Sequence, residues 1–219
     1  MLFGEVMAQV RGVAPGHVPY LDFLAARILA QSVLFVAIFY GISAIWERDL
    51  GVLQRYLVSP APRSALVLGK AISAGVRALS QALIVYLLAL LLGVGVDLHP
   101  ISTLGVIAVV VLGSWLFSTL SLIIACIVRT RERFMGIGQV LTMPIFFASN
   151  AIYPVSLMPE WLRIVSHANP LTYEVDALRT LMLTNGVSDY GLWLDFGILL
   201  GIAILLTAIA SRSYARMGY

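Results

Sequence analysis

Long apolar stretches alternate with short polar ones along the whole chain. A helix that crosses a membrane needs about 20 mostly apolar residues. Five stretches are of this kind: Ile28–Ile45, Ala78–Val96, Leu104–Val128, Met135–Tyr153 and Leu192–Ala210. A closed barrel would instead show many short strands of alternating polarity. The pattern therefore predicts an all-α membrane protein, a polytopic bundle of five transmembrane helices that forms a single membrane domain over residues 1–219.

The composition supports this class. Hydrophobic residues make up 60% of the 219 residues and charged residues 11%, and the mean hydropathy is +0.96, whereas a soluble domain carries about 25% charged residues. Cys126 is the only cysteine in the sequence, so no intrachain disulfide is expected. The net charge of +3 is small, and no nucleic-acid partner is expected.

The basic residues gather on one side of the predicted spans. Ten of the fourteen lie between spans one and two, between spans three and four, or after span five: Arg48, Arg55, Arg63, Lys70, Arg77, Arg129, Arg131, Arg133, Arg212 and Arg216. Cytoplasmic loops collect Lys and Arg, so this side is predicted to be cytoplasmic and the N-terminus outer. An outer N-terminus without a signal sequence leads us to expect an earlier, sixth span in the native protein.

The segment Glu47–Lys70 is charged and broken by prolines. Leu50, Leu53 and Leu57 have the spacing of one helix face, and the prolines at 60 and 62 must end that helix. A second helix is predicted to start at Pro62 and to run through Lys70 into the second span. The alternative is an ordinary positive-inside loop whose helix lies on lipid.

The outer stretch 151–191 is predicted to hold two short helices. One is the amphipathic run Pro159–Ser166. The other starts at Asn169 as N-cap and Pro170 as first residue and carries an apolar stripe of Leu171, Val175, Leu178 and Met182. Asp176 and Arg179 are placed to pair. These helices are expected to lie in the outer interface or to dip back against the spans.

Several kinds of chemistry find no support in the sequence. Around Gly69 and Lys70 a phosphate-binding loop lacks its first glycine and its hydroxyl residue. The three histidines show no metal-ligand spacing, so no catalytic residue, metal site or resident cofactor is predicted. No carboxylate stands near the middle of a predicted span, which counts against an ion-coupled carrier. Energy for transport would then come from another chain.

Three stretches resemble the permease subunits of type-2 ATP-binding-cassette (ABC) exporters, especially drug and nodulation-factor exporters. The first is the Glu47-Arg48-Asp49 start, the helix from Gly51 to Leu57, Pro60 and the Gly69-Lys70 pair. The second runs from Tyr20 to Leu24 and into residues 28–32. The third is Asn169 to Tyr173 followed by Asp176 to Arg179. The resemblance covers essentially the whole chain, but Ala26-Arg27 stands where the family usually has Pro-Gly.

The resemblance implies a six-span permease in the plasma (inner) membrane of a bacterium. It implies no enzyme activity in this chain. Its partners would be membrane lipid, a second permease copy or sibling, and a cytoplasmic ABC ATPase that holds ATP and Mg²⁺. The substrate would be an amphiphilic drug, lipid or saccharide moved outward.

The resemblance also assigns roles to residues. The coupling contacts to the ATPase, in the cytoplasmic segment 47–70, would be Glu47, Arg48, Asp49, Leu50, Leu53, Arg55, Leu57, Pro60 and Lys70. The outer motif would be Asn169, Pro170, Tyr173, Asp176 and Arg179. Two alternatives stay open, an ion-coupled secondary transporter and a membrane scaffold that transports nothing.

Overall fold

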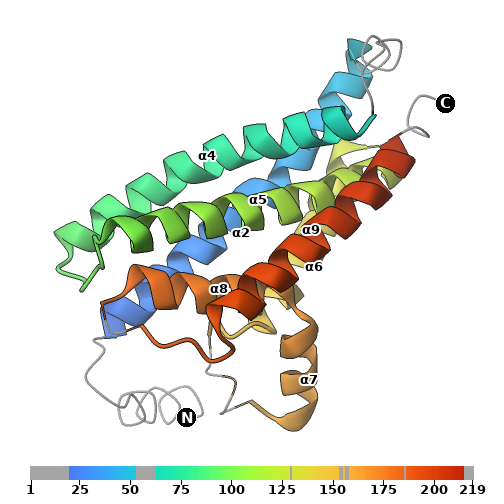
Figure 1. The fold of residues 1–219 in the computed structure, drawn as a ribbon. Helices are drawn as coiled ribbons and strands as arrows, with labels where there is room; N and C mark the ends of the chain where they lie inside the picture. Colours follow the sequence, from blue (N-terminus) through green and yellow to red (C-terminus); the bar gives the residue numbers. More distant parts are fainter. Residues whose placement is uncertain are drawn as a thin grey trace.

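The structure, a computed structural model, describes residues 20–52, 63–128, 130–152, 155, 158–184 and 186–214. Within these residues it contains seven helices (Figure 1): α2 (Tyr20–Asp49), α4 (Arg63–Leu91), α5 (Pro100–Ile127), α6 (Arg131–Phe147), α7 (Glu160–Ala168), α8 (Pro170–Met182) and α9 (Leu192–Tyr214). The prediction of an all-α polytopic membrane protein is confirmed.

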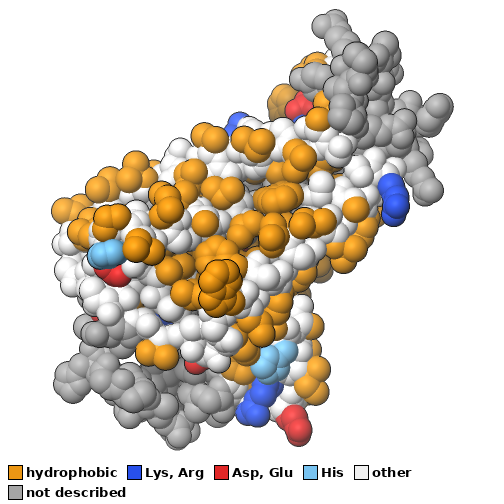
Figure 2. Space-filling view, viewed as in Figure 1, with side chains coloured by type: hydrophobic (Ala, Val, Ile, Leu, Met, Phe, Trp, Pro, Cys, Tyr) orange, Lys and Arg blue, Asp and Glu red, His pale blue; other side chains and the backbone are white. Residues whose placement is uncertain are grey.

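Helix α5 lies at the centre of the bundle. It packs against α2, α4, α8 and α9, and its buried side chains include Val109, Leu116 and Phe117. Helix α5 contains no charged residue, and a helix that is apolar on all sides belongs in an interior. Apolar side chains also cover much of the visible side of the bundle (Figure 2), as a lipid-facing surface requires.

Helices α2 and α5 approach each other closely at Gly41. The Gly41 backbone N–H donates to Ser121 Oγ at 3.0 Å, and that hydroxyl donates to the Ile38 carbonyl oxygen. A Cβ at position 41 would lie 2.7 Å from the Phe134 ring. Glycine at this position therefore permits the helix crossing, and Ser121 is satisfied by backbone on both sides.

Among the residues that the structure describes, four helices are long and apolar enough to cross a membrane: Leu24–Asp49, Ser64–Leu91, Pro100–Ile127 and Leu192–Ser213. The first, third and fifth predicted spans lie within or almost within α2, α5 and α9, and are confirmed.

The second predicted span needs new bounds. Helix α4 starts at Arg63 and ends at Leu91 instead of Val96. Gly93 follows with φ 74°, a left-handed conformation that ends the helix. The prediction that one helix runs from the Pro62 break through Lys70 into the span is confirmed, because α4 continues unbroken from Arg63.

The fourth predicted span, Met135–Tyr153, needs earlier bounds. Helix α6 covers 17 residues and ends at Phe147, three residues after Pro144. Its length is about 26 Å, and its first turn is charged, with Arg131 and Glu132. Arg131 at the start of α6 pairs with Asp49 at the basic end, and the carbonyl of Ile145 near the end of α6 accepts from Asn169 of the outer motif, so α6 runs from the basic end towards the outer motif.

Candidate functional site

The charged triplet Glu47-Arg48-Asp49 forms the last turn of α2. Glu47 was predicted to belong to the cytoplasmic segment whose helix carries Leu50, Leu53 and Leu57, and the structure places it in α2 instead. The helix ends because Gly51 adopts φ 70°, and the Gly51 N–H donates to the Arg48 carbonyl at 3.0 Å. The triplet is therefore a continuous part of a membrane-spanning helix.

Each residue of the triplet contacts a different helix. Glu47 accepts from Lys70 Nζ on α4, at 2.7 Å to both carboxylate oxygens. Arg48 Nη1 donates to the carbonyl of Val128, the residue that caps α5, at 3.4 Å. Asp49 pairs with Arg131 on α6 at 3.1 Å. Three consecutive residues thus join the end of α2 to α4, α5 and α6.

The Lys70–Glu47 and Arg131–Asp49 ion pairs differ in solvent exposure. The side chains of Lys70 and Glu47 are 10% and 28% exposed, whereas those of Arg131 and Asp49 are about 40% exposed. Arg131 also lies over the ring of Trp46, 3.9 Å from its centroid. An exposed pair such as Arg131–Asp49 contributes about 0–1 kcal/mol and can form and break at little cost, whereas the largely buried Lys70–Glu47 pair is costlier to break.

The structure describes only some of the remaining candidate coupling residues. Leu53, Arg55, Leu57 and Pro60 lie outside the described residues. Leu50 follows α2 directly and is 70% exposed. The contact between Glu47 and Lys70 brings the two ends of the predicted coupling segment together.

The outer motif builds the start of α8. Asn169 Oδ1 accepts from the Leu171 N–H at 3.0 Å, which confirms the predicted N-cap, and Pro170 is the first helical residue. Asn169 Nδ2 donates to the Ile145 carbonyl of α6 at 2.6 Å. Tyr173 Oη donates to the His167 carbonyl of α7 at 2.7 Å. The motif therefore fixes α8 to both neighbouring helices.

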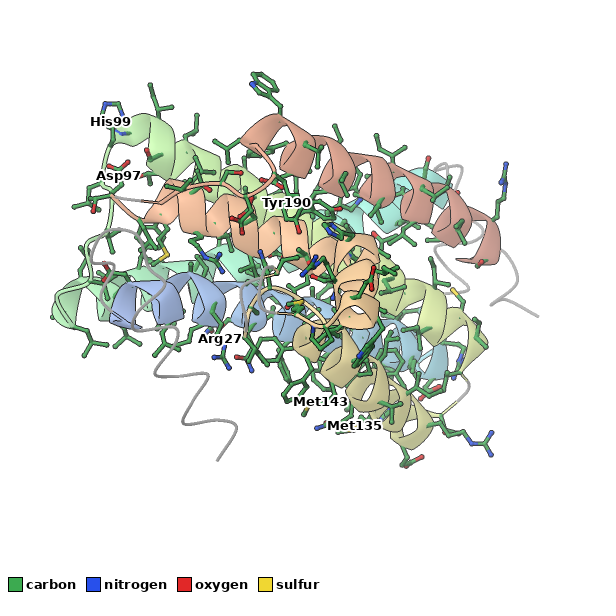
Figure 3. All side chains as sticks on the ribbon, turned by 90° about the horizontal axis from the view of Figure 1, so that it is seen from below. Arg27, Asp97, His99, Met135, Met143 and Tyr190 are labelled. Carbon is green, nitrogen blue, oxygen red and sulfur yellow. The ribbon has the colours of Figure 1, made fainter. Side chains whose placement is uncertain are left out.

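Helix α8 lies inside the bundle. It packs against α2, α5 and α9 (Figure 3), and every residue from Leu171 to Leu178 is buried. The predicted apolar stripe is buried as expected. The opposite, polar face is buried as well, which the periodicity of the sequence did not indicate.

Asp176 closes the following loop onto α8. Its carboxylate accepts from Ser188 Oγ at 2.8 Å and from the N–H groups of Asp189 and Tyr190 at 3.1 and 3.3 Å. Arg179 donates to the Asn150 carbonyl at 3.2 Å and lies 3.9 Å from Asp189. Burial lowers the pKa of the Arg179 guanidinium, while Asp176 and Asp189 act in the opposite sense. The two motif charges thus hold the outer loops.

Glu174 was not among the residues predicted from the sequence to have a role. Its side chain is fully buried against Gly113 of α5, and its carboxylate oxygens have no hydrogen-bond partner among the described residues. Burial raises the pKa of Glu174 well above its ordinary value. The one available signal was Gly113 in the long apolar run of α5, but a glycine does not identify the residue that packs against it.

Known proteins similar to this chain are transport proteins. A family model described as "ABC-2 type transporter" matches residues 2–183. The "Putative transport permease ycf38" of Cyanophora paradoxa is 29% identical over 167 residues, which cover 74% of this chain and 56% of the relative. The "Daunorubicin resistance ABC transporter permease protein DrrB1" of Streptomyces coeruleorubidus is 27% identical over 194 residues, or 87% of this chain and 65% of the relative.

A third relative agrees with these two. The "Nodulation protein J" of Sinorhizobium fredii is 28% identical over 182 residues, or 82% of this chain and 66% of the relative. The chain thus spans between about half and two thirds of the length of these curated relatives.

Proposed function

Because this chain belongs to the ABC-2 type transporter family, we propose that it is the membrane-spanning permease subunit of an ATP-driven exporter. The substrate is an amphiphile, either a drug, a lipid or a saccharide. The family match carries this proposal, and the names of two relatives, one for daunorubicin resistance and one for nodulation, support the substrate class.

The energy comes from a separate ABC ATPase that binds ATP and Mg²⁺. The sequence around Gly69 and Lys70 lacks the residues of a phosphate-binding loop, which supports a separate motor. In this proposal the ATPase docks on the segment between α2 and α4, with Leu50, Leu53 and Leu57 as apolar contacts.

The charged triplet at the end of α2 supports a route for the movement. A displacement of the docked segment acts first on the last turn of α2. Glu47, Arg48 and Asp49 then carry it to α4, α5 and α6 through the three contacts described above. Helices are stiff and the contacts are near water, so the helices shift as units while the pairs rearrange.

The permease works beside a second copy of itself or a sibling chain. It lies in the plasma membrane of a bacterium with its basic end in the cytoplasm, in accordance with the positive-inside rule.

An ion-coupled secondary transporter is the second candidate, and Glu174 favours it, since a buried carboxylate without a hydrogen-bond partner is the kind of group that such carriers protonate. Transport driven by a proton gradient without nucleotide would identify this second candidate.

The test is co-purification of the co-expressed ABC ATPase with the Leu53→Asp variant. A carboxylate in an apolar docking contact should abolish co-purification while membrane insertion stays intact. The matched control is Val187→Asp, which places the same charge on a 77% exposed residue of an outer loop. Undiminished co-purification of the ATPase by Leu53→Asp would count against the docking role.

A further inference from the structure

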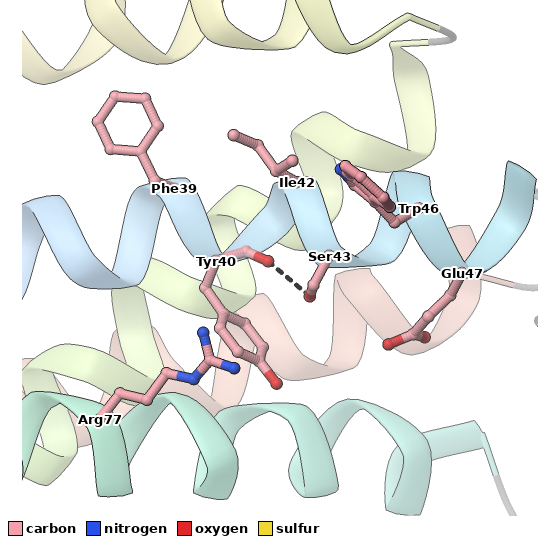
Figure 4. A pocket seen from close by; sticks show the side chains of 7 residues that line it. All are labelled: Phe39, Tyr40, Ile42, Ser43, Trp46, Glu47 and Arg77. Atoms are coloured by element: carbon pink, nitrogen blue, oxygen red, sulfur yellow. Dashed lines mark hydrogen bonds between the residues drawn. The ribbon is translucent and has the colours of Figure 1, made fainter.

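A groove of about 490 Å³ opens beside the last three turns of α2. Its walls are Phe39, Tyr40, Ile42, Ser43, Trp46, Glu47 and, from α4, Arg77 (Figure 4). Most of the lining is aromatic or apolar. The groove lies in the half of the bundle that ends in the charged triplet, close to the basic end.

Two contacts between α2 and α4 mark the length of this groove. Near the basic end, Glu47 holds Lys70 at 2.7 Å. Seven residues away along each helix, Arg77 lies over the Tyr40 ring, 5.3 Å from its centroid. Seven residues of helix measure about 10 Å. The two contacts thus join equivalent positions of α2 and α4. The first pairs opposite charges, whereas the second has an aromatic ring where the first has a carboxylate.

The groove carries a net positive charge. Glu47 is balanced by Lys70, and Asp49 balances Arg131 at the rim. Arg77 has an aromatic contact but no carboxylate partner among the described residues. A guanidinium has five donors in a planar fork that fits the oxygens of a phosphate. The groove therefore combines an unbalanced cation with an apolar wall.

The depth of Arg77 suits a lipid head group. About 20 residues of helix span the hydrocarbon layer, and counted back from Leu91 they begin at Ile72. Arg77 then lies five residues, or about 8 Å, inside that layer. An arginine side chain reaches over such a distance toward the head-group level, and a charge left unpaired in this position would be expensive.

We propose that this groove binds one anionic phospholipid from the leaflet at the basic end of the bundle, with its phosphate on Arg77 and an acyl chain along Phe39, Ile42 and Trp46. A zwitterionic lipid carries the same phosphate, but its own ammonium competes with Arg77. The site should therefore prefer a lipid of net negative charge. The proposal does not depend on the transport function proposed above.

Native mass spectrometry of the purified full chain tests the site, with dioleoylphosphatidylglycerol and dioleoylphosphatidylcholine as probes of equal chain length. We expect the wild type to hold phosphatidylglycerol about tenfold more tightly, in line with one charge-assisted hydrogen-bonded contact. Arg77→Gln should abolish the preference. Arg77→Lys should keep part of it, because the charge remains while the fork is lost.

The matched control is Arg27→Gln. Arg27 also lies over an aromatic ring, 5.4 Å from the centroid of Phe146, but it stands at the opposite end of α2. This variant should keep the full lipid preference. Equal binding of the two lipids by the wild type, or an equal loss in the Arg77→Gln and Arg27→Gln variants, would overturn the proposal.

A second readout places the lipid in the groove. In nanodiscs, brominated phosphatidylglycerol should quench tryptophan fluorescence more than brominated phosphatidylcholine, and the difference should disappear in Trp46→Phe and in Arg77→Gln. A difference that persists in Trp46→Phe would place the lipid elsewhere and would contradict the assignment.

Discussion

Glu47 lies at the basic end of the helical bundle and Glu174 lies in its interior, against the middle of α5, and their surroundings differ. Glu47 lies 28% exposed at the basic end and holds Lys70 at 2.7 Å. Glu174 is fully buried against Gly113, near the middle of α5, and has no hydrogen-bond partner among the described residues. Neighbouring residues follow the same division, since Asp49 pairs with Arg131 near water while Asp176 is enclosed by loop N–H groups.

The difference indicates what each end can do. Exposed ion pairs exchange with water at low cost, so the basic end can rearrange as a docked partner moves. Buried carboxyl groups are costly to disturb, because their hydrogen bonds or their protons must be replaced. The outer end is therefore expected to stay fixed around α8 while the basic end transmits movement.

The largest effect is expected from Asp176→Ala. The substitution leaves the N–H groups of Asp189 and Tyr190 and the Ser188 hydroxyl without their acceptor, so we expect a loss of about 3–5 kcal/mol. Thermal unfolding in detergent measures it. Asp176→Asn keeps one acceptor oxygen and should lose less. A loss below about 1 kcal/mol for Asp176→Ala would mean that the outer end is not held as described.

Gly113→Ala should be the next most damaging change. The added methyl group would overlap the carboxylate of Glu174, and overpacking of this kind costs about 1–3 kcal/mol. Gly69→Ala is the control, since nothing lies within 4 Å of a Cβ there and alanine favours the helix. In a Glu174→Ala background the effect of Gly113→Ala should vanish, and an unchanged effect would show that the two residues do not meet.

The stability of the protein should depend on pH through Glu174. Burial raises the pKa of Glu174 in the folded state above its unfolded value of 4.5, so the folded protein binds the proton more tightly. This contribution is complete below pH 4.5 and is lost as the pH rises toward the folded pKa, by up to about 1.4 kcal/mol per pH unit. Unfolding of wild type and Glu174→Gln, compared from pH 5 to 8, measures this slope, which should be flatter in the variant. Parallel curves would refute the burial of an isolated carboxyl group.

The smallest effects on stability are expected at the basic end. Asp49→Ala should lower the free energy of unfolding by no more than about 1 kcal/mol, and Lys70→Ala by somewhat more, because Lys70 is buried and its loss leaves Glu47 without its partner. Exchange of the charges in the double variant Glu47→Lys, Lys70→Glu should restore most of the loss. A loss as large as that of Asp176→Ala would remove the contrast between the two ends.

The elements that local rules govern could be predicted from the sequence. Apolar length identified α2, α5 and α9, and the Asn169-Pro170 pair identified the start of α8. In each case the interactions lie within one helix or its first turn. The same kind of rule gave the wrong end for α4, because the apolar run continues past Gly93, where the backbone turns.

Contacts between distant segments were beyond such reasoning. Glu174 occupies the polar face of an amphipathic helix, and nothing local says that α5 covers this face with Gly113. Glu47 finds Lys70 across 23 residues of chain, which depends on the antiparallel register of α2 and α4. The fourth span was predicted to end too late, because the residues directly after Phe147 form turns instead of a longer helix.

The central claim is that this permease has no motor of its own and receives work at its basic end. ATP hydrolysis in proteoliposomes that hold the co-expressed ABC ATPase, with and without this chain, tests it most directly. The account predicts faster hydrolysis with the wild-type chain and a return to the ATPase-only rate with Leu53→Asp. The same rate in all three preparations would contradict it.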